Sequence, residues 1–133
     1  LGLEALSRGA SHAVFIERDP RHARAVQQNI TNLGLLDQCT VIRGSAFAAV
    51  RPTRQLAHTP ASLVFLDPPH AMAVDKAGEF WPWLRELSQT PLVNFETTIV
   101  FGHPARFDMP ELGALRVEDT RKYGTVAFSL LRL

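Results

Sequence analysis

The sequence predicts an α/β fold in which helices cover both faces of a mostly parallel, twisted sheet. Short apolar runs alternate with stretches of helical periodicity along the chain, an order that is typical of parallel strands joined by helices. Within each run the apolar residues are continuous, which indicates strands buried on both faces. Two runs around Tyr123-Gly124 have no helix between them, so the sheet is expected to finish in an antiparallel hairpin.

The expected strands are rich in β-branched and aromatic residues and stop at polar or turn-forming residues. They cover residues 12–16, 40–43, 62–66, 97–101, 115–119 and 126–131. Glu17 and Asp67 each follow a strand directly, and Ser45 lies in the first turn after a strand. Because ligands in parallel α/β folds sit at the carboxyl ends of strands, we expect these three residues to line one edge of the sheet.

The clearest helix starts after Asp19, a residue type that caps helices, and has Pro20 in its first position. Apolar residues then recur at helical spacing until Gly34. A longer helix is expected over residues 74–87, broken or kinked at Pro82.

Length and composition predict one domain that spans residues 1–133, because 133 residues at 46% hydrophobic content are enough for a single core. The chain opens on Leu1-Gly2-Leu3-Glu4, which has the pattern of a helix already under way. We therefore expect the domain to be N-terminally incomplete. Its first strand, which would lie in the middle of the sheet, is expected to be absent from this chain.

Several classes of protein are disfavoured by the same composition. No apolar run approaches the roughly 20 residues that cross a bilayer, and no secretory segment is visible. The single Cys39 excludes an internal disulfide, and the five histidines show no ligand-like spacing, so no metal site is expected. A net charge of +1 argues against a strongly electrostatic hold on nucleic acid. These features fit a cytoplasmic protein, which we expect to be a monomer.

Glu17 is a candidate cofactor ligand because it follows a strand and precedes a capped helix. A carboxylate at this position can accept hydrogen bonds from the two hydroxyls of a ribose, as in dinucleotide-binding folds. A structural role, such as pairing with Arg18, is the alternative that the residues leave open.

Asp67-Pro68-Pro69-His70 is the most distinctive motif in the chain. Two consecutive prolines remove two backbone donors and leave carbonyl oxygens as the exposed polar groups. The Asp67 side chain and the Pro68 carbonyl could then hold an exocyclic amine of a nucleobase, whose two hydrogens need acceptors. His70 offers a ring that could stack on a base drawn out of its helix or loop. A plain strand terminator is the alternative interpretation of the tetrapeptide.

Taken together, these motifs resemble the bacterial methyltransferases that modify the N2 amine of a guanine in small-subunit (16S) ribosomal RNA. The resemblance covers nearly the whole chain in the expected order. Its matching stretches are residues 1–10, the strand that ends in Glu17 with Asp19 two residues on, 29–35, 65–69 and the hairpin at Tyr123-Gly124.

The resemblance implies a Rossmann-like class I methyltransferase that uses S-adenosyl-L-methionine and acts on ribosomal RNA or the small ribosomal subunit. Asp67, Pro68, Pro69 and His70 would form the catalytic motif. The cofactor-binding residues would be Gly2, as the third glycine of a glycine-rich turn, Glu17 and Arg18 at the ribose, and Ser45 and Ala46 at the adenine.

Three positions depart from the family pattern. Ser45 is shorter than the Asp or Asn usual at the adenine, and His70 replaces the Phe or Tyr that usually follows Asp-Pro-Pro. Gly102 stands where relatives often carry an acid. Two other functions therefore stay open: methylation of adenine N6 in DNA or RNA, and RNA binding by a relative that does not catalyse.

Overall fold

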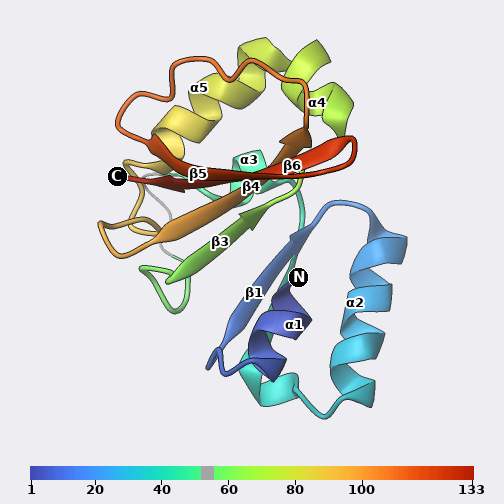
Figure 1. The fold of residues 1–133 in the computed structure, drawn as a ribbon. Helices are drawn as coiled ribbons and strands as arrows, with labels where there is room; N and C mark the ends of the chain where they lie inside the picture. The colour runs from blue at the N-terminus through green and yellow to red at the C-terminus, as the bar shows by residue number, and fades with distance from the viewer. Residues whose placement is uncertain (52–55) are drawn as a thin grey trace. The chain divides into compact units, whose positions relative to one another are not determined.

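The computed structural model describes residues 1–51 and 56–133, apart from the side chains of His70, Val74 and Asp75. The chain divides into two compact units, residues 1–58 and residues 59–133. The ribbon in Figure 1 shows the helices and strands of both, and each unit is taken by itself below.

The first unit is built on two parallel strands that pair from Ala13 with Cys39 to Glu17 with Arg43. Helices pack against them, as the order of elements predicts. The elements are α1 (Gly2–Ser7), β1 (Ala13–Glu17), α2 (Pro20–Asn32), the 3-10 turn η1 (Leu36–Gln38), β2 (Cys39–Arg43) and α3 (Ala46–Ala49).

Helix α2 begins where the sequence predicts. The Asp19 side chain accepts a hydrogen bond from the backbone N–H of Arg21 at 2.8 Å, and Pro20 occupies the first helical position. The helix buries Ala23 and Ile30, and Gly34 follows it with a φ of +68°, the left-handed conformation that glycine adopts at little cost. The Arg21 guanidinium also bonds the Asp19 carboxylate, which lowers the pKa of Asp19 to about 2.

The second unit contains a four-stranded sheet in the order β3-β4-β6-β5. Its β3 runs parallel to β4, whereas β4 with β6 and β6 with β5 are antiparallel. The elements are β3 (Leu63–Leu66), α4 (His70–Asp75), α5 (Ala77–Leu87), β4 (Thr98–Pro104), β5 (Arg116–Tyr123) and β6 (Val126–Arg132). The C-terminal hairpin is thus confirmed, and it is longer than the sequence indicates. An irregularity in its register between Val117 and Asp119 interrupts the ladder.

Helices α4 and α5 lie together over one face of this sheet (Figure 1). Aromatic rings fill the space between α5 and the sheet. The ring centroids of Phe80 and Trp81 on α5 lie 5.7 and 5.8 Å from that of Phe101 on β4. The indole N–H of Trp81 donates to the Ala73 carbonyl at 3.1 Å, which ties α5 to α4. This face of the sheet is therefore a packed core.

The expected break of the second long helix at Pro82 is wrong. Helix α5 continues through Pro82, and the interruption lies instead at Lys76, between α4 and α5. A proline inside a helix costs about 3 kcal/mol. Helix α5 buries four side chains, Phe80, Trp81, Leu84 and Leu87, and each large buried apolar side chain contributes about 1.5–3 kcal/mol. Packing against the sheet outweighs the cost of the proline.

A chain of polar side chains, buried at His103 and Ser129, joins the three strands that follow Asp67. The Pro104 carbonyl can only accept, so Nδ1 of His103 donates to it at 2.8 Å. Nε2 of His103 lies 2.8 Å from the Ser129 hydroxyl, which lies 2.8 Å from the Thr120 hydroxyl. His103 is therefore a structural residue that fixes β4, β6 and β5 to one another.

Within the described part of the chain, no helix has the length and apolar content needed to cross a bilayer.

Candidate functional site

The Asp67-Pro68-Pro69 motif lies where β3 ends, beside the middle of β4. Leu66 pairs with Phe101 in the parallel ladder, so Asp67 comes next to Gly102. A β-carbon on Gly102 would stand 2.6 Å from Oδ1 of Asp67, closer than real side-chain contacts. The absence of a side chain at Gly102 is what makes room for the Asp67 carboxylate.

The polar groups of the motif are acceptors, and most are free. The Pro69 carbonyl accepts the backbone N–H of Met72 at 2.8 Å. Across residues 1–51 and 56–133, neither the exposed Asp67 carboxylate nor the Pro68 carbonyl has a hydrogen-bond partner. These two acceptors are thus available to a donor from outside. His70 is the first residue of α4, and its side chain lies outside what the structure describes.

A half-buried aromatic residue borders the carboxylate on the same face of the sheet. Phe128 pairs with Gly102 across the β4–β6 ladder, and its ring lies 3.2 Å from the position that a β-carbon on Gly102 would take. Tyr123 contacts this ring edge-on at 6.4 Å between centroids and is 61% exposed. Asp67, Gly102, Phe128 and Tyr123 form a continuous surface on the sheet face opposite to the one that α5 covers.

Sequence reasoning missed Gly102 and Phe128 as parts of this surface. A signal existed for Gly102, because a glycine inside an otherwise apolar strand often indicates a close approach of another group. For Phe128 none existed, since its place beside Asp67 depends on the register of β4 with β6.

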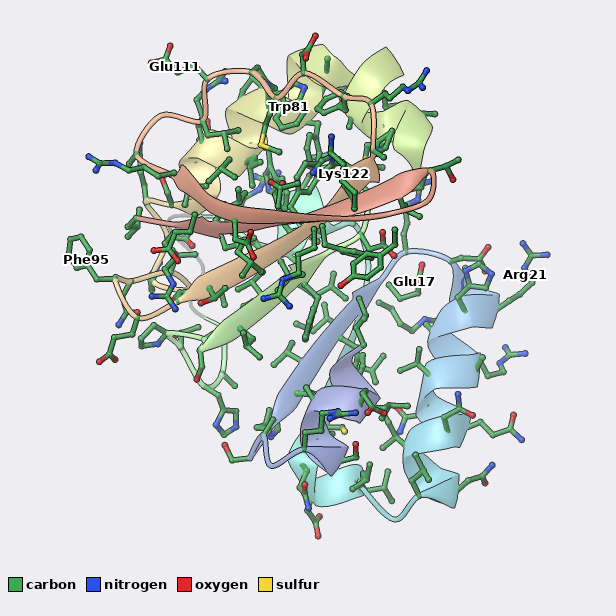
Figure 2. All side chains as sticks on the ribbon, viewed as in Figure 1. Glu17, Arg21, Trp81, Phe95, Glu111 and Lys122 are labelled. Carbon is green, nitrogen blue, oxygen red and sulfur yellow. The ribbon has the colours of Figure 1, made fainter. Side chains whose placement is uncertain are left out.

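In the first unit, Glu17 is the last residue of β1 (Figure 2). Its Oε1 accepts the backbone N–H of Asp19 at 2.8 Å, and its backbone carbonyl accepts the N–H of Gly44 at 3.0 Å. Oε2 has no hydrogen-bond partner in the part of the chain that the structure describes. Arg18 is exposed and makes no ion pair with Glu17 among the same residues.

Ser45 and Ala46 lie directly after the end of β2, as expected. Ser45 is the N-cap residue of α3, yet its hydroxyl makes no capping bond, and Ala46 is the first residue of the helix. The bond between Gly44 and Glu17 holds this turn beside the end of β1. Glu17, Ser45 and Ala46 are therefore gathered at one edge of the two-stranded sheet.

Gly2 lies in α1, against the ring of Phe15 on β1. A β-carbon there would stand 2.6 Å from Cε1 of Phe15. The position thus requires glycine, because the helix packs closely on the strand. The third glycine of a glycine-rich cofactor-binding turn has the same physical role.

Two groups of residues result, each fixed within its own unit: Gly2, Glu17, Ser45 and Ala46 in the first, and Asp67, Pro68 and Pro69 in the second. Among the described residues, no cluster of three or more His, Cys, Asp or Glu side chains could hold a metal ion.

A protein-family model described as "Conserved hypothetical protein 95" matches residues 1–132. The chain belongs to this family. This chain is also similar to a curated protein, "Putative rRNA methyltransferase YlbH" of Bacillus subtilis (strain 168), with 29% identity over 133 residues. The match covers 99% of this chain and 69% of that relative.

Solved structures show the fold of this family member. "Putative methyltransferase yhhF" from Escherichia coli superposes with a TM-score of 0.81 and 25% identity, covering 99% of this chain and 70% of that one. "Putative methylase HI0767" from Haemophilus influenzae superposes with a TM-score of 0.76 and 23% identity, covering 98% of this chain and 78% of that one. The fold is that of the class I methyltransferases, as the sequence predicts.

Proposed function

We propose that the chain is an S-adenosylmethionine-dependent methyltransferase that modifies the exocyclic N2 amine of a guanine in small-subunit ribosomal RNA. The observation that carries this proposal is a pair of free acceptors at the end of β3, the carboxylate of the exposed Asp67 and the carbonyl of the half-buried Pro68. The fold supports the reaction class, and the name of the Bacillus subtilis relative supports ribosomal RNA as the substrate.

The residues of the first unit fit the cofactor. Ribose hydroxyls need acceptors, and Glu17 retains a free carboxylate oxygen at the end of a parallel strand. We assign Glu17 to the ribose, with Arg18 beside it, Ser45 and Ala46 to the adenine, and Gly2 to the close packing of α1. When bound, S-adenosylmethionine would supply a methyl group carried on a sulfonium centre.

The residues of the second unit would orient the amine. Asp67 would accept a hydrogen bond from one N–H of the amine and the Pro68 carbonyl from the other, which directs the nitrogen lone pair away from both acceptors. Transfer would form a nitrogen–carbon bond as the carbon–sulfur bond of the cofactor breaks, and the amine would then lose a proton to water. No strong base is needed, because the leaving group is a neutral thioether and orientation supplies most of the rate.

We also propose that both units belong to one methyltransferase domain, with the cofactor bound by the first and the amine held by the second. His70 remains in the proposed catalytic motif as the residue after the prolines, where a ring could stack on the target base.

The test is transfer of labelled methyl groups to immature small ribosomal subunits, followed by digestion and identification of the modified nucleoside. The expected product is N2-methylguanosine. Label in N6-methyladenine of DNA or RNA would replace the guanine proposal with the adenine one. RNA binding without any measurable affinity for S-adenosylmethionine in calorimetry would leave only a non-catalytic role.

A further inference from the structure

A pocket opens at the end of the C-terminal hairpin, where β4 leaves the sheet. Its volume is about 510 Å³, and its walls are Pro104, Ala105, Arg106, Lys122, Gly124 and Thr125. The walls are held together, because the Ala105 N–H donates to the Thr125 carbonyl at 2.9 Å and Pro104 pairs with Val126 in the ladder. Figure 2 shows Lys122 on the hairpin.

The two cations of this pocket are unpaired. Neighbouring charges on the hairpin neutralise one another: Arg121 pairs with Asp119 at 3.1 Å, and Arg132 pairs with Glu118 at 3.3 Å. The side chains of Arg106 and Lys122, in contrast, have neither an ion pair nor a hydrogen bond anywhere in residues 1–51 and 56–133. The pocket is therefore a local concentration of positive charge and N–H donors on a chain whose net charge is only +1.

The pocket lies at the same edge of the sheet as Asp67. Gly102 is directly beside Asp67, and Pro104 is two residues further along β4, a distance of roughly 7 Å at the rise of a strand. Both positions are in the second unit, so their separation is fixed. Lys122 pairs with Ala127 and therefore lies on the face that α5 covers, opposite to Asp67. A nucleic-acid strand that presents a base to Asp67 would reach Arg106 and Lys122 by passing around the carboxyl end of β4.

Building on the function proposed above, we propose that this pocket binds a phosphodiester of the RNA backbone next to the target nucleotide. Lysine and arginine are the usual partners of phosphate oxygens, and such contacts fix the register of a protein on its nucleic acid without reading sequence. The Lys122 ammonium offers three donors and the Arg106 guanidinium five. The acceptors at Asp67 and Pro68 recognise an amine but not its position in the RNA. A phosphate contact would supply this missing information, because it fixes where the protein lies along the RNA.

The test compares two double variants of the full chain that lose the same charge. Arg106→Gln with Lys122→Gln removes the pocket cations, and Arg8→Gln with Arg116→Gln removes two exposed arginines that do not line the pocket. Filter binding to naked small-subunit ribosomal RNA is measured from 50 to 200 mM potassium chloride, with inorganic phosphate as a competitor at constant ionic strength.

The pocket variant is expected to lower the slope of log affinity against log salt by about 0.7, which corresponds to one single-strand phosphate contact. Its loss of affinity between the two salt concentrations becomes about 2.6-fold smaller than that of the unmodified protein. Its KM for RNA should rise while kcat stays unchanged, and the control variant should keep the original slope.

Four outcomes would overturn the inference. Equal changes in both variants would show that only net charge matters. Full protection by millimolar inorganic phosphate would assign the pocket to a free anion, and unchanged RNA binding with lost binding to an acidic peptide would assign it to a protein. A protein that binds RNA through the pocket but transfers no methyl group would refute the proposed function and not the proposed role of the pocket. Methylation of RNA with unchanged KM in the pocket variant would refute the pocket alone.

Discussion

Replacing Gly102 with alanine should damage catalysis while leaving the fold intact. The new methyl carbon would stand 2.6 Å from Oδ1 of Asp67 and 3.2 Å from Cε1 of Phe128. Contacts of this kind begin at 3.0 Å and are ordinary from 3.4 Å, so the carboxylate must move by about 0.4 to 0.8 Å. Because Asp67 is exposed, it can move without disturbing the core.

The expected size of the effect follows from the cost of misplacing a positioning group. A displacement of about 1 Å costs on the order of a hundredfold in rate, so Gly102→Ala should lower kcat about ten- to a hundredfold, or roughly 1.4 to 2.7 kcal/mol of activation free energy. The stability of the variant should change by less than about 1 kcal/mol, since alanine restricts the unfolded chain and partly offsets the crowding.

Gly78→Ala is the matched control for this experiment. A β-carbon at Gly78 meets nothing within 4 Å, and the position lies in α5, where alanine is a better helix former than glycine. Single-turnover methyl transfer and urea unfolding are measured on both variants. A Gly102→Ala protein with normal kcat would refute the role of Gly102 as the space for the carboxylate, and so would a kcat that falls only in proportion to the folded fraction.

Three further results are expected. Asp67→Ala should abolish methyl transfer while the affinity for S-adenosylmethionine in calorimetry stays within about tenfold; equal losses of binding and turnover would indicate a structural role for Asp67. Gly2→Ala should cost about 1–3 kcal/mol of unfolding free energy in urea, because the added carbon stands 2.6 Å from the Phe15 ring, and an unchanged midpoint would contradict that packing. The pKa of Asp19 lies at about 2 in the folded chain, below its ordinary 3.8, through its bond to Arg21. Its ionised form therefore stabilises the fold above about pH 4, and this contribution is lost as pH falls toward 2; Asp19→Asn should flatten the pH dependence of unfolding between about pH 4 and 2, and identical slopes would rule the contribution out.

Local signals explain what could be predicted about the fold from the sequence. The start of α2 depends on Asp19 and Pro20, which act on their immediate neighbours, and the position is correct. The continuation of α5 through Pro82 could not be predicted in this way, since it depends on side chains of the helix that are buried against strands far along the chain. Where a local preference opposed tertiary packing, packing decided the structure.

The same distinction between local and tertiary signals applies to the candidate site. The Asp-Pro-Pro motif is contiguous, so a role for it as a pair of acceptors could be proposed from the sequence. Its surroundings could not, because Gly102 and Phe128 meet Asp67 only through the pairing of β3 with β4 and of β4 with β6. The pocket at Arg106 and Lys122 likewise joins residues that are distant in the sequence, and neither arginine nor lysine carries a local signal of its partner.

The outer strand of the four-stranded sheet has a consequence for how the protein behaves at high concentration. Every residue of β5 is exposed, four of them between Arg116 and Arg121 carry charge, and the ladder is irregular near Glu118. A flat, uncharged edge strand would offer its open row of amide and carbonyl groups to a second chain, and this is a common start of aggregation. The charges and the irregularity of β5 oppose such pairing, so the hairpin can remain open to solvent and available to RNA without drawing copies of the protein together.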